Sequence, residues 1–174
     1  HTHWKEGWDI PRLIEEKGLS NSDILTTYYC KACGQYEVRS YNGEEQQCRQ
    51  CGSRNTLNTT NTQHGVNEEQ LNEIYNLMDV YCHPFTSGGM EIPIFEAKMT
   101  ELITLVTDYS CGEDSSSVEC GSFPLDWAEY REPGTQFIKA STYPSSIAKQ
   151  LKKVLQMNPS KRRLMGQKGK KWTI

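Results

Sequence analysis

The sequence predicts an α/β protein: a Rossmann-like parallel sheet with helices on both faces, plus a small inserted zinc ribbon with four cysteine ligands. Helical patterns alternate with short β-branched runs, as in doubly wound sheets. Residues 80–83 are expected to form a buried strand, and residues 102–107 are almost wholly apolar and β-branched, as parallel strands covered on both faces are. Four of the seven cysteines form two C-x-x-C pairs, separated by residues 34–47.

The chain opens with a predicted helix and a predicted strand. Asp9 is a candidate helix N-cap, with Pro11 just inside a helical pattern over residues 8–17. A β-branched and aromatic run over residues 23–29 is typical of a strand. We assign residues 1–27 to the start of the α/β domain. Because the chain does not begin with Met, we expect a fragment or an excised domain whose first strand is missing.

Each C-x-x-C pair is followed directly by glycine, which is typical of a zinc knuckle. In a knuckle, two thiolates bind one ion while backbone N–H groups of the turn point at the sulfurs. Gly34 and Gly52 allow the left-handed conformation that closes such a turn. The sequence therefore predicts one structural zinc ion in a tetrahedral site. The four predicted ligands are Cys30, Cys33, Cys48 and Cys51.

Other interpretations of these cysteines stay open. Two disulfides would require an oxidising compartment, and a redox C-x-x-C would not need a second copy. Iron also suits a tetrahedral site of four sulfurs. The inserted segment, residues 28–60, has too few large apolar residues for a core of its own, so we expect a metal to hold it.

Residues 61–174 are predicted to form the remainder of the α/β domain. A helix begins at Asn67 with acidic residues in its first turn and an apolar stripe along one side. The buried strand 80–83 follows and leads into the glycine-containing loop 86–89. Pro93 lies near the first position of the next helix, where the missing N–H of proline is tolerated.

The alternation continues to the end of the chain. After the strand 102–107, residues 108–132 are rich in Ser, Cys, Gly and acids, which predicts a long loop. A short strand is expected over residues 136–139. A helix over residues 145–157 has apolar residues on one face, and a basic helix is expected over residues 159–172.

The charge balance is slightly acidic, with 22 Asp and Glu against 19 Lys and Arg. It gives no bulk electrostatic reason to expect nucleic acid as the main partner. Basic residues cluster at 149–153 and 161–171, where they form either a solvated helix face or a peripheral contact with an anionic membrane. No signal peptide is visible and no apolar run reaches the ~20 residues of a membrane span, so we expect a cytoplasmic location.

The loop between the strand 80–83 and the helix at Pro93 is the candidate ligand site. In open α/β sheets, ligands bind beyond the carboxyl ends of the strands. Glycine lets the backbone approach a ligand closely, and a helix N-terminus attracts anions such as a diphosphate. Glu91 either stabilises the helix dipole or contacts the ligand. Glu96, about one turn further on, faces either the crevice or the side of the helix.

Residues 67–107 resemble the donor-site segment of retaining glycosyltransferases of group 1, which have two Rossmann-like domains in the GT-B architecture. The matching parts are the helix after Asn67, the strand that ends in His83-Pro84, and the segment Ile92-Pro93-Ile94-Phe95-Glu96-Ala97. In the family this region is roughly H-P-S-x-x-E-G-F-G-L-P-x-x-E-A, and its E-x7-E pair binds the nucleotide sugar. The resemblance implies that this chain is the C-terminal, donor-binding domain.

The family pattern can be transferred residue by residue. Its second glutamate falls on Glu96, which would accept hydrogen bonds from the ribose hydroxyls. Its first glutamate falls on Gly88, so that carboxylate is absent, and Glu91 is the candidate to replace it as the catalytic carboxylate. Backbone amides of the loop would contact the transferred sugar or its phosphates. The implied donor site consists of Gly88, Gly89, Met90, Glu91 and Glu96.

The resemblance extends to both ends of the chain. Residues 1–19 are similar to the end of a family strand and the helix after it, and residues 145–172 resemble the terminal helices. Glu101 stands where the family usually has glycine. The ribbon has no counterpart. The acceptor-binding domain and the basic diphosphate contacts would lie before His1, so we expect this chain to be inactive by itself.

Two functions follow from these observations. In the first, the chain binds a nucleotide sugar and, together with its missing acceptor-binding domain, transfers the sugar to an unknown acceptor with retention. In the second, it is a non-catalytic, degenerate member of the family whose ribbon docks a protein or a nucleic acid. A ribbon-bearing nucleic-acid protein is a third, weaker hypothesis, because the ribbon has few aromatic residues.

Overall fold

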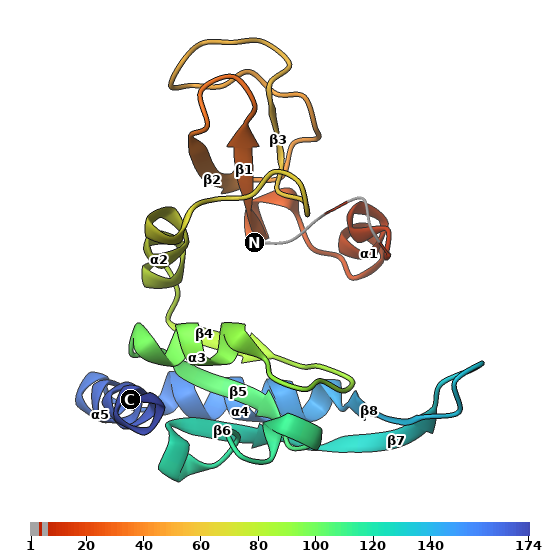
Figure 1. Ribbon diagram of the computed structural model, residues 1–174, viewed down its shortest axis with the longest axis vertical. Helices are drawn as coiled ribbons and strands as arrows, with labels where there is room; N and C mark the ends of the chain where they lie inside the picture. The colour runs from red at the N-terminus through yellow and green to blue at the C-terminus, as the bar shows by residue number, and fades with distance from the viewer. Residues whose placement is uncertain (1–3, 5–6) are drawn as a thin grey trace. The chain divides into compact units, whose positions relative to one another are not determined.

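The structure is a computed structural model that describes Trp4 and residues 7–174 (Figure 1). It divides into two compact units, His1–Ile74 and Tyr75–Ile174. The strand end that the resemblance places near the start of the chain falls on residues outside the described range. None of the described helices is both long enough and apolar enough to cross a membrane.

The first unit is built around a small antiparallel sheet. Its strands lie in the order β2-β1-β3, and its first helix has the predicted cap, with the Asp9 side chain accepting the Arg12 N–H. The elements are α1 (Ile10–Glu16), η1 (Asn21–Asp23), β1 (Leu25–Cys30), β2 (Tyr36–Ser40), β3 (Leu57–Thr59) and α2 (Glu68–Asn76), whose last residues belong to the second unit.

Strand β1 differs from the prediction in its partners. It forms where the sequence predicts a strand, but it pairs antiparallel with β2 and β3 instead of joining the parallel sheet. The reason lies in its buried side chains. Tyr28, Cys30, Cys48 and Leu57 form a core cluster of their own, with Tyr41 packed against it. The strand therefore serves the ribbon, and its last residue, Cys30, belongs to the cluster of four cysteines.

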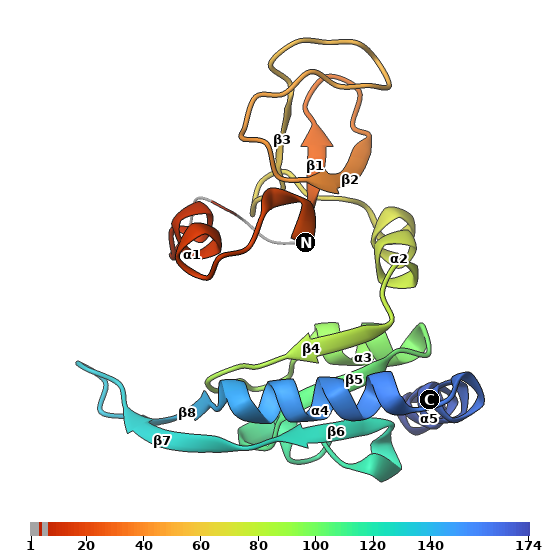
Figure 2. The same ribbon diagram turned by 180° about the vertical axis from the view of Figure 1, so that it is seen from behind.

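The second unit contains the predicted parallel sheet, with strands in the order β4-β5-β6. Helices α3 and α4 cover opposite faces of the sheet (Figures 1 and 2). The adjacent parallel pairing of β4 and β5 confirms the prediction made from their apolar runs. The elements are β4 (Val80–His83), α3 (Ile92–Met99), β5 (Ile103–Thr107), η2 (Ser110–Gly112), η3 (Val118–Cys120), β6 (Ser122–Leu125), β7 (Trp127–Arg131), β8 (Ile138–Thr142), α4 (Pro144–Gln156) and α5 (Pro159–Thr173).

The prediction of one long loop over residues 108–132 was wrong, because this segment contains two strands. Strand β6 pairs with β5 and buries Phe123 and Leu125, whereas β7 forms an antiparallel hairpin with β8. The signal for β6 is weak in the sequence because the strand is short and includes Pro124. Proline lacks an N–H and is expected at a sheet edge, and β6 is indeed an edge strand of this sheet.

Within the second unit, helix α5 packs closely against the backbone of Glu101 through Gly166. A Cβ added to Gly166 would lie 1.9 Å from the Glu101 carbonyl oxygen, so the two backbones touch. Glu101, which stands where the family usually has glycine, adopts a left-handed conformation with a φ of 62°. Nearby, fully buried Lys98 donates hydrogen bonds to the carbonyls of Ser115 and Cys120. Burial lowers the pKa of Lys98 to about 8.

Candidate functional site

Strand β4 presents a row of aromatic side chains on one face. Because side chains alternate along a strand, Tyr81 and His83 share a face, and the opposite face packs on the apolar core. The rings of Tyr81 and His83 stack at 5.5 Å, and the ring of Phe85 lies 5.5 Å beyond His83. The ring of buried Tyr75, from the end of α2, meets Tyr81 edge-on at 5.7 Å.

The His83 side chain holds Glu91 at the start of α3. His83 Nε2 lies 2.9 Å from Glu91 Oε2, and both side chains are mostly buried, with exposed fractions of 19% and 25%. The other ring nitrogen, Nδ1, lies 3.1 Å from the Tyr81 hydroxyl. Glu91 is the N-cap residue of α3, but its side chain caps no helix amide. Its carboxylate thus faces a neighbouring side chain instead of the first turn of the helix.

The Glu91 carboxylate also occupies the space beside Gly88. A Cβ built on Gly88 would lie 2.1 Å from Glu91 Oε1, so a side chain at position 88 and the present position of Glu91 exclude each other. The loop is fixed from the other side by Ser110, whose hydroxyl donates to the Gly88 carbonyl at 2.9 Å. The Glu91 carboxylate therefore lies in the space that the first side-chain atom of a residue at position 88 would need.

Glu96 is held by a different partner. The Tyr75 hydroxyl donates to Glu96 Oε2 at 2.9 Å, and no described residue bonds the other carboxylate oxygen. Burial raises the pKa of Tyr75, and the hydrogen bond to Glu96 raises it further, so the hydroxyl stays protonated as a donor. Tyr81 has its pKa raised to about 12, mainly by burial. Both tyrosines are therefore neutral at physiological pH.

Free backbone donors lie in the loop and not in the first turn of α3. Within the described part of the chain, the amides of Gly88, Gly89 and Met90 donate to no protein acceptor. In the helix, Pro93 has no N–H and Ile94 donates to the Glu91 carbonyl. The anion site expected at the helix N-terminus is thus formed mainly by the three loop amides that precede it.

A groove of about 540 Å³ lies beside this loop, between the end of β4 and the β7–β8 hairpin. The hairpin is tied to the loop by a hydrogen bond from the Ala140 amide to the Thr86 carbonyl, 2.8 Å long. The lining of the groove combines aromatic, aliphatic and hydroxyl groups without a charged side chain. The lining residues are Pro84, Phe85, Thr86, Tyr130, Ala140, Ser141, Thr142 and Ile147.

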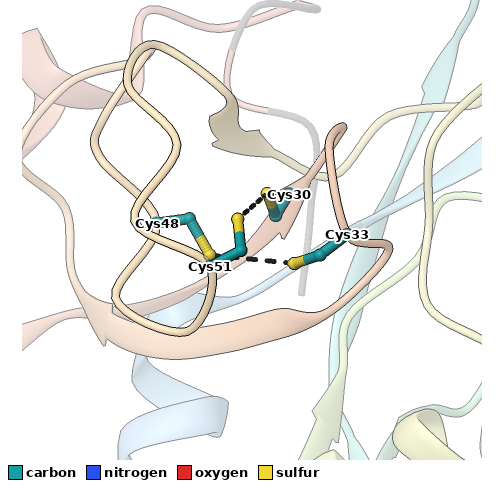
Figure 3. A group of neighbouring side chains, drawn as sticks. All are labelled: Cys30, Cys33, Cys48 and Cys51. Atoms are coloured by element: carbon teal, nitrogen blue, oxygen red, sulfur yellow. Dashed lines mark hydrogen bonds between the residues drawn. The ribbon is translucent and has the colours of Figure 1, made fainter.

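The four predicted metal ligands come together in the first unit (Figure 3). All four cysteines are free, and their sulfurs lie within 4.8 Å of one another. The Sγ atoms of Cys30 and Cys51 are 3.8 Å apart, and those of Cys33 and Cys48 are 3.9 Å apart. In a tetrahedron with Zn–S bonds of ~2.3 Å the sulfurs are about 3.8 Å apart, so the donor set fits a zinc ion.

The two knuckles have the same backbone geometry. Gly34 donates to the Cys30 carbonyl at 2.9 Å, and Gly52 donates to the Cys48 carbonyl at 3.0 Å. Both glycines are left-handed, with φ values of 72° and 74°. Amides within each turn point at the first cysteine sulfur, as expected around a thiolate ligand. The structure therefore agrees with the prediction in the conformation of the two turns as well as in which cysteines come together.

The roles of His83, Tyr75 and Tyr81 were not predicted from the sequence. These side chains support the two glutamates, and their signal was present in the sequence: Tyr81 and His83 alternate with apolar residues on a strand that leads into the candidate loop. A polar residue that alternates with apolar ones on a strand covered by helices on both faces needs a partner. The alternation could have identified His83 but not its pairing with Glu91.

Comparison with known proteins identifies a family for this chain. A family model described as "Glycosyl transferases group 1" matches residues 13–172. No curated protein and no solved structure matches the chain. The matched range includes the parallel sheet, the loop that holds Gly88 and Glu91, and both C-terminal helices.

Proposed function

Because the chain belongs to the glycosyl transferases group 1 family, we propose that it is the donor-binding domain of a retaining GT-B enzyme. Membership of the family implies sugar transfer from a nucleotide-sugar donor. More specifically, we propose that this chain is the C-terminal half of such an enzyme and that the enzyme transfers the sugar with retention. The acceptor-binding surface then belongs to a second domain.

The observation that supports this proposal is the loop after β4. Three free backbone amides, at residues 88–90, come directly before Glu91, whose carboxylate lies beside Gly88, and Glu96 follows about one turn further along α3. Backbone N–H groups at the start of a helix bind anions, and carboxylates accept hydrogen bonds from sugar hydroxyls. A ligand that is both a diphosphate and a polyol, as a nucleotide sugar is, uses both kinds of group.

The proposed roles follow from this chemistry. The amides of Gly88, Gly89 and Met90 bind the diphosphate and stabilise the charge that develops on it as the sugar leaves. Glu96 accepts hydrogen bonds from the ribose through its free oxygen, while Tyr75 holds the other one. Glu91 contacts the transferred sugar in place of the glutamate that the family has at the position of Gly88. Dissociation of the nucleoside diphosphate completes the turnover.

Titration calorimetry with nucleoside diphosphates tests the site. We expect the protein to bind UDP or GDP, and Glu96→Ala to weaken that binding by roughly 1–3 kcal/mol, because the ribose loses a charged acceptor. Glu129→Ala, which removes an exposed carboxylate from β7, is the matched control and should bind like the wild type. Failure of the wild type to bind either nucleotide would instead favour the non-catalytic interpretation, for which Gly88 is the motivating observation.

A second prediction concerns turnover by this polypeptide. The described chain contains one parallel sheet of three strands, whereas the family architecture uses two Rossmann-like domains. Holding an acceptor against the donor is worth ~7–11 kcal/mol of barrier, so we expect slow donor hydrolysis at most. The measurement is product analysis after incubation with nucleotide sugars and simple saccharide acceptors. Robust transfer to a saccharide would contradict the proposed division of labour.

The cluster of four cysteines is proposed to hold zinc in a structural role. Four thiolates complete a tetrahedral site and leave no coordination position for water or substrate. Zinc instead of disulfides fits a reducing compartment, in keeping with the cytoplasmic location predicted from the sequence. The ribbon then either scaffolds its neighbours in the chain or docks a partner, and a partner-binding role goes with the non-catalytic alternative.

A further inference from the structure

We propose that His83 is a positioning residue for the donor site: it holds the Glu91 carboxylate beside Gly88, so that Glu91 acts on the sugar side of the donor. The inference rests on the proposed function, because it assumes a nucleotide sugar in the loop. It gives a role to His83, the residue that aligns with the histidine at the start of the family pattern, and it explains how the site works without a glutamate at position 88.

The imidazole ring of His83 is packed against two aromatic neighbours. The Tyr81 ring stacks on it at 5.5 Å, the Phe85 ring is tilted against it at 5.5 Å, and the side chain is 19% exposed. Phe85 is in turn anchored to β5, because its amide donates to the Thr107 hydroxyl at 3.1 Å. Contact with both aromatic rings restricts the orientation of the imidazole and therefore the direction of the hydrogen bond that it makes through Nε2.

The hydrogen bonds around the imidazole fit one assignment of protons. A carboxylate that is ionised only accepts hydrogen bonds, and with Glu91 in that form His83 Nε2 is the donor at the 2.9 Å contact. In the neutral ring Nδ1 is then the acceptor, and the Tyr81 hydroxyl, which stays protonated, donates to it at 3.1 Å. The direction of donation therefore runs from Tyr81 through His83 to Glu91, and Glu91 keeps its other oxygen for a ligand.

The Glu91 carboxylate that His83 holds lies in the space beside Gly88. Glu91 Oε1 lies where the Cβ of a residue at position 88 would be, only 2.1 Å from that ideal position. A glutamate side chain has several rotatable bonds, and ordering it costs conformational entropy. Without the hydrogen bond from His83 the side chain would leave this place and turn to solvent, because no other described side chain bonds it.

The two carboxylates have separate supports, which makes the proposal testable. His83 holds Glu91, on the proposed sugar side, whereas Tyr75 holds Glu96, on the proposed ribose side. Loss of His83 should therefore change the affinity for a nucleotide sugar relative to that for the bare nucleotide. A residue that mattered only for folding would weaken both ligands to the same extent.

The experiment is calorimetric titration of two ligand pairs, UDP with UDP-glucose and GDP with GDP-mannose, using whichever pair binds the wild type. In His83→Leu we expect the Kd of the nucleotide to stay within twofold, while the Kd of the nucleotide sugar rises about five- to tenfold, the loss of one charge-assisted hydrogen bond. His83→Gln, which offers an amide donor at the position of Nε2, should restore most of the difference. Tyr75→Phe should act on the nucleotide itself.

The outcomes separate this inference from the proposed function. Glu91→Gln should reproduce the effect of His83→Leu, and the double variant should be no weaker than either single one, because the two side chains act as one unit. An unchanged ratio of the two affinities in His83→Leu, or equal losses for both ligands, would overturn the positioning role while leaving donor binding intact. A wild type that binds none of the four ligands would overturn both.

Discussion

Removal of the metal is expected to unfold the ribbon and to leave the parallel sheet folded. The core cluster around β1 contains four residues, and two of them, Cys30 and Cys48, are themselves predicted ligands. Such a small core does not offset the chain entropy of more than thirty residues. Apparent zinc-binding energies in small domains are ~10–16 kcal/mol, and that energy is folding energy.

The measurement combines metal analysis with hydrogen exchange. The purified protein should contain one zinc per chain, and after chelation the amides of β1, β2 and β3 should exchange at once while those of β4 and β5 stay protected. Cys48→Ser should give the same pattern without a chelator. Cys111→Ser is the matched control, since Cys111 lies outside the cluster and this variant should retain zinc. A protein without zinc or iron whose ribbon amides stay protected would refute the metal site.

Replacement of Gly166 by alanine should destabilise the second unit by roughly 2–3 kcal/mol, because overpacking a rigid contact forces backbone shifts. The new Cβ would lie 1.9 Å from the Glu101 carbonyl oxygen, and a backbone atom cannot turn away as a side chain can. Helix propensity alone acts in the opposite direction, since alanine is better than glycine in a helix by ~1 kcal/mol. The sign of the change therefore distinguishes the clash from the propensity.

Gly169→Ala provides the matched control within the same helix. The nearest atoms to a Cβ there are Lys98 Cγ at 3.4 Å and the Cys120 carbonyl oxygen at 3.5 Å, which is ordinary contact. We expect this variant to be as stable as the wild type or slightly more stable. Urea unfolding, followed by the fluorescence of Trp127 and Trp172, measures both variants. Equal stabilities for the two would show that α5 is not docked through Gly166.

The sequence was most informative where one local pattern determines the structure. The glycines after each C-x-x-C predicted left-handed turns, and Gly34 and Gly52 have them. The apolar runs predicted β4 and β5 as parallel neighbours. In each case a few adjacent residues contain the whole signal, because turn sterics and strand burial act over short distances.

The missed features depend on residues far apart in the chain. Strand β6 is defined by pairing with β5, and only Phe123 and Leu125 give it a local pattern. Strand β1 was predicted, but its choice of the ribbon sheet was decided by tertiary contacts of Tyr28 and Leu57. The hydrogen bond between His83 and Glu91 depends on the conformation of the loop between them, which the periodicity of apolar residues does not predict. Pairing partners are set by the fold and not by local propensity.

The contact between Glu91 and Gly88 has a consequence for substitutions at position 88. With Glu91 in its present place, a glutamate introduced at position 88 would meet an occupied space and a like charge. Because the occupying atom is the far end of a flexible side chain, a glutamate at position 88 would displace the Glu91 side chain from His83 and leave the loop backbone in place. The space beside the loop therefore accommodates one carboxylate at a time, supplied from either position.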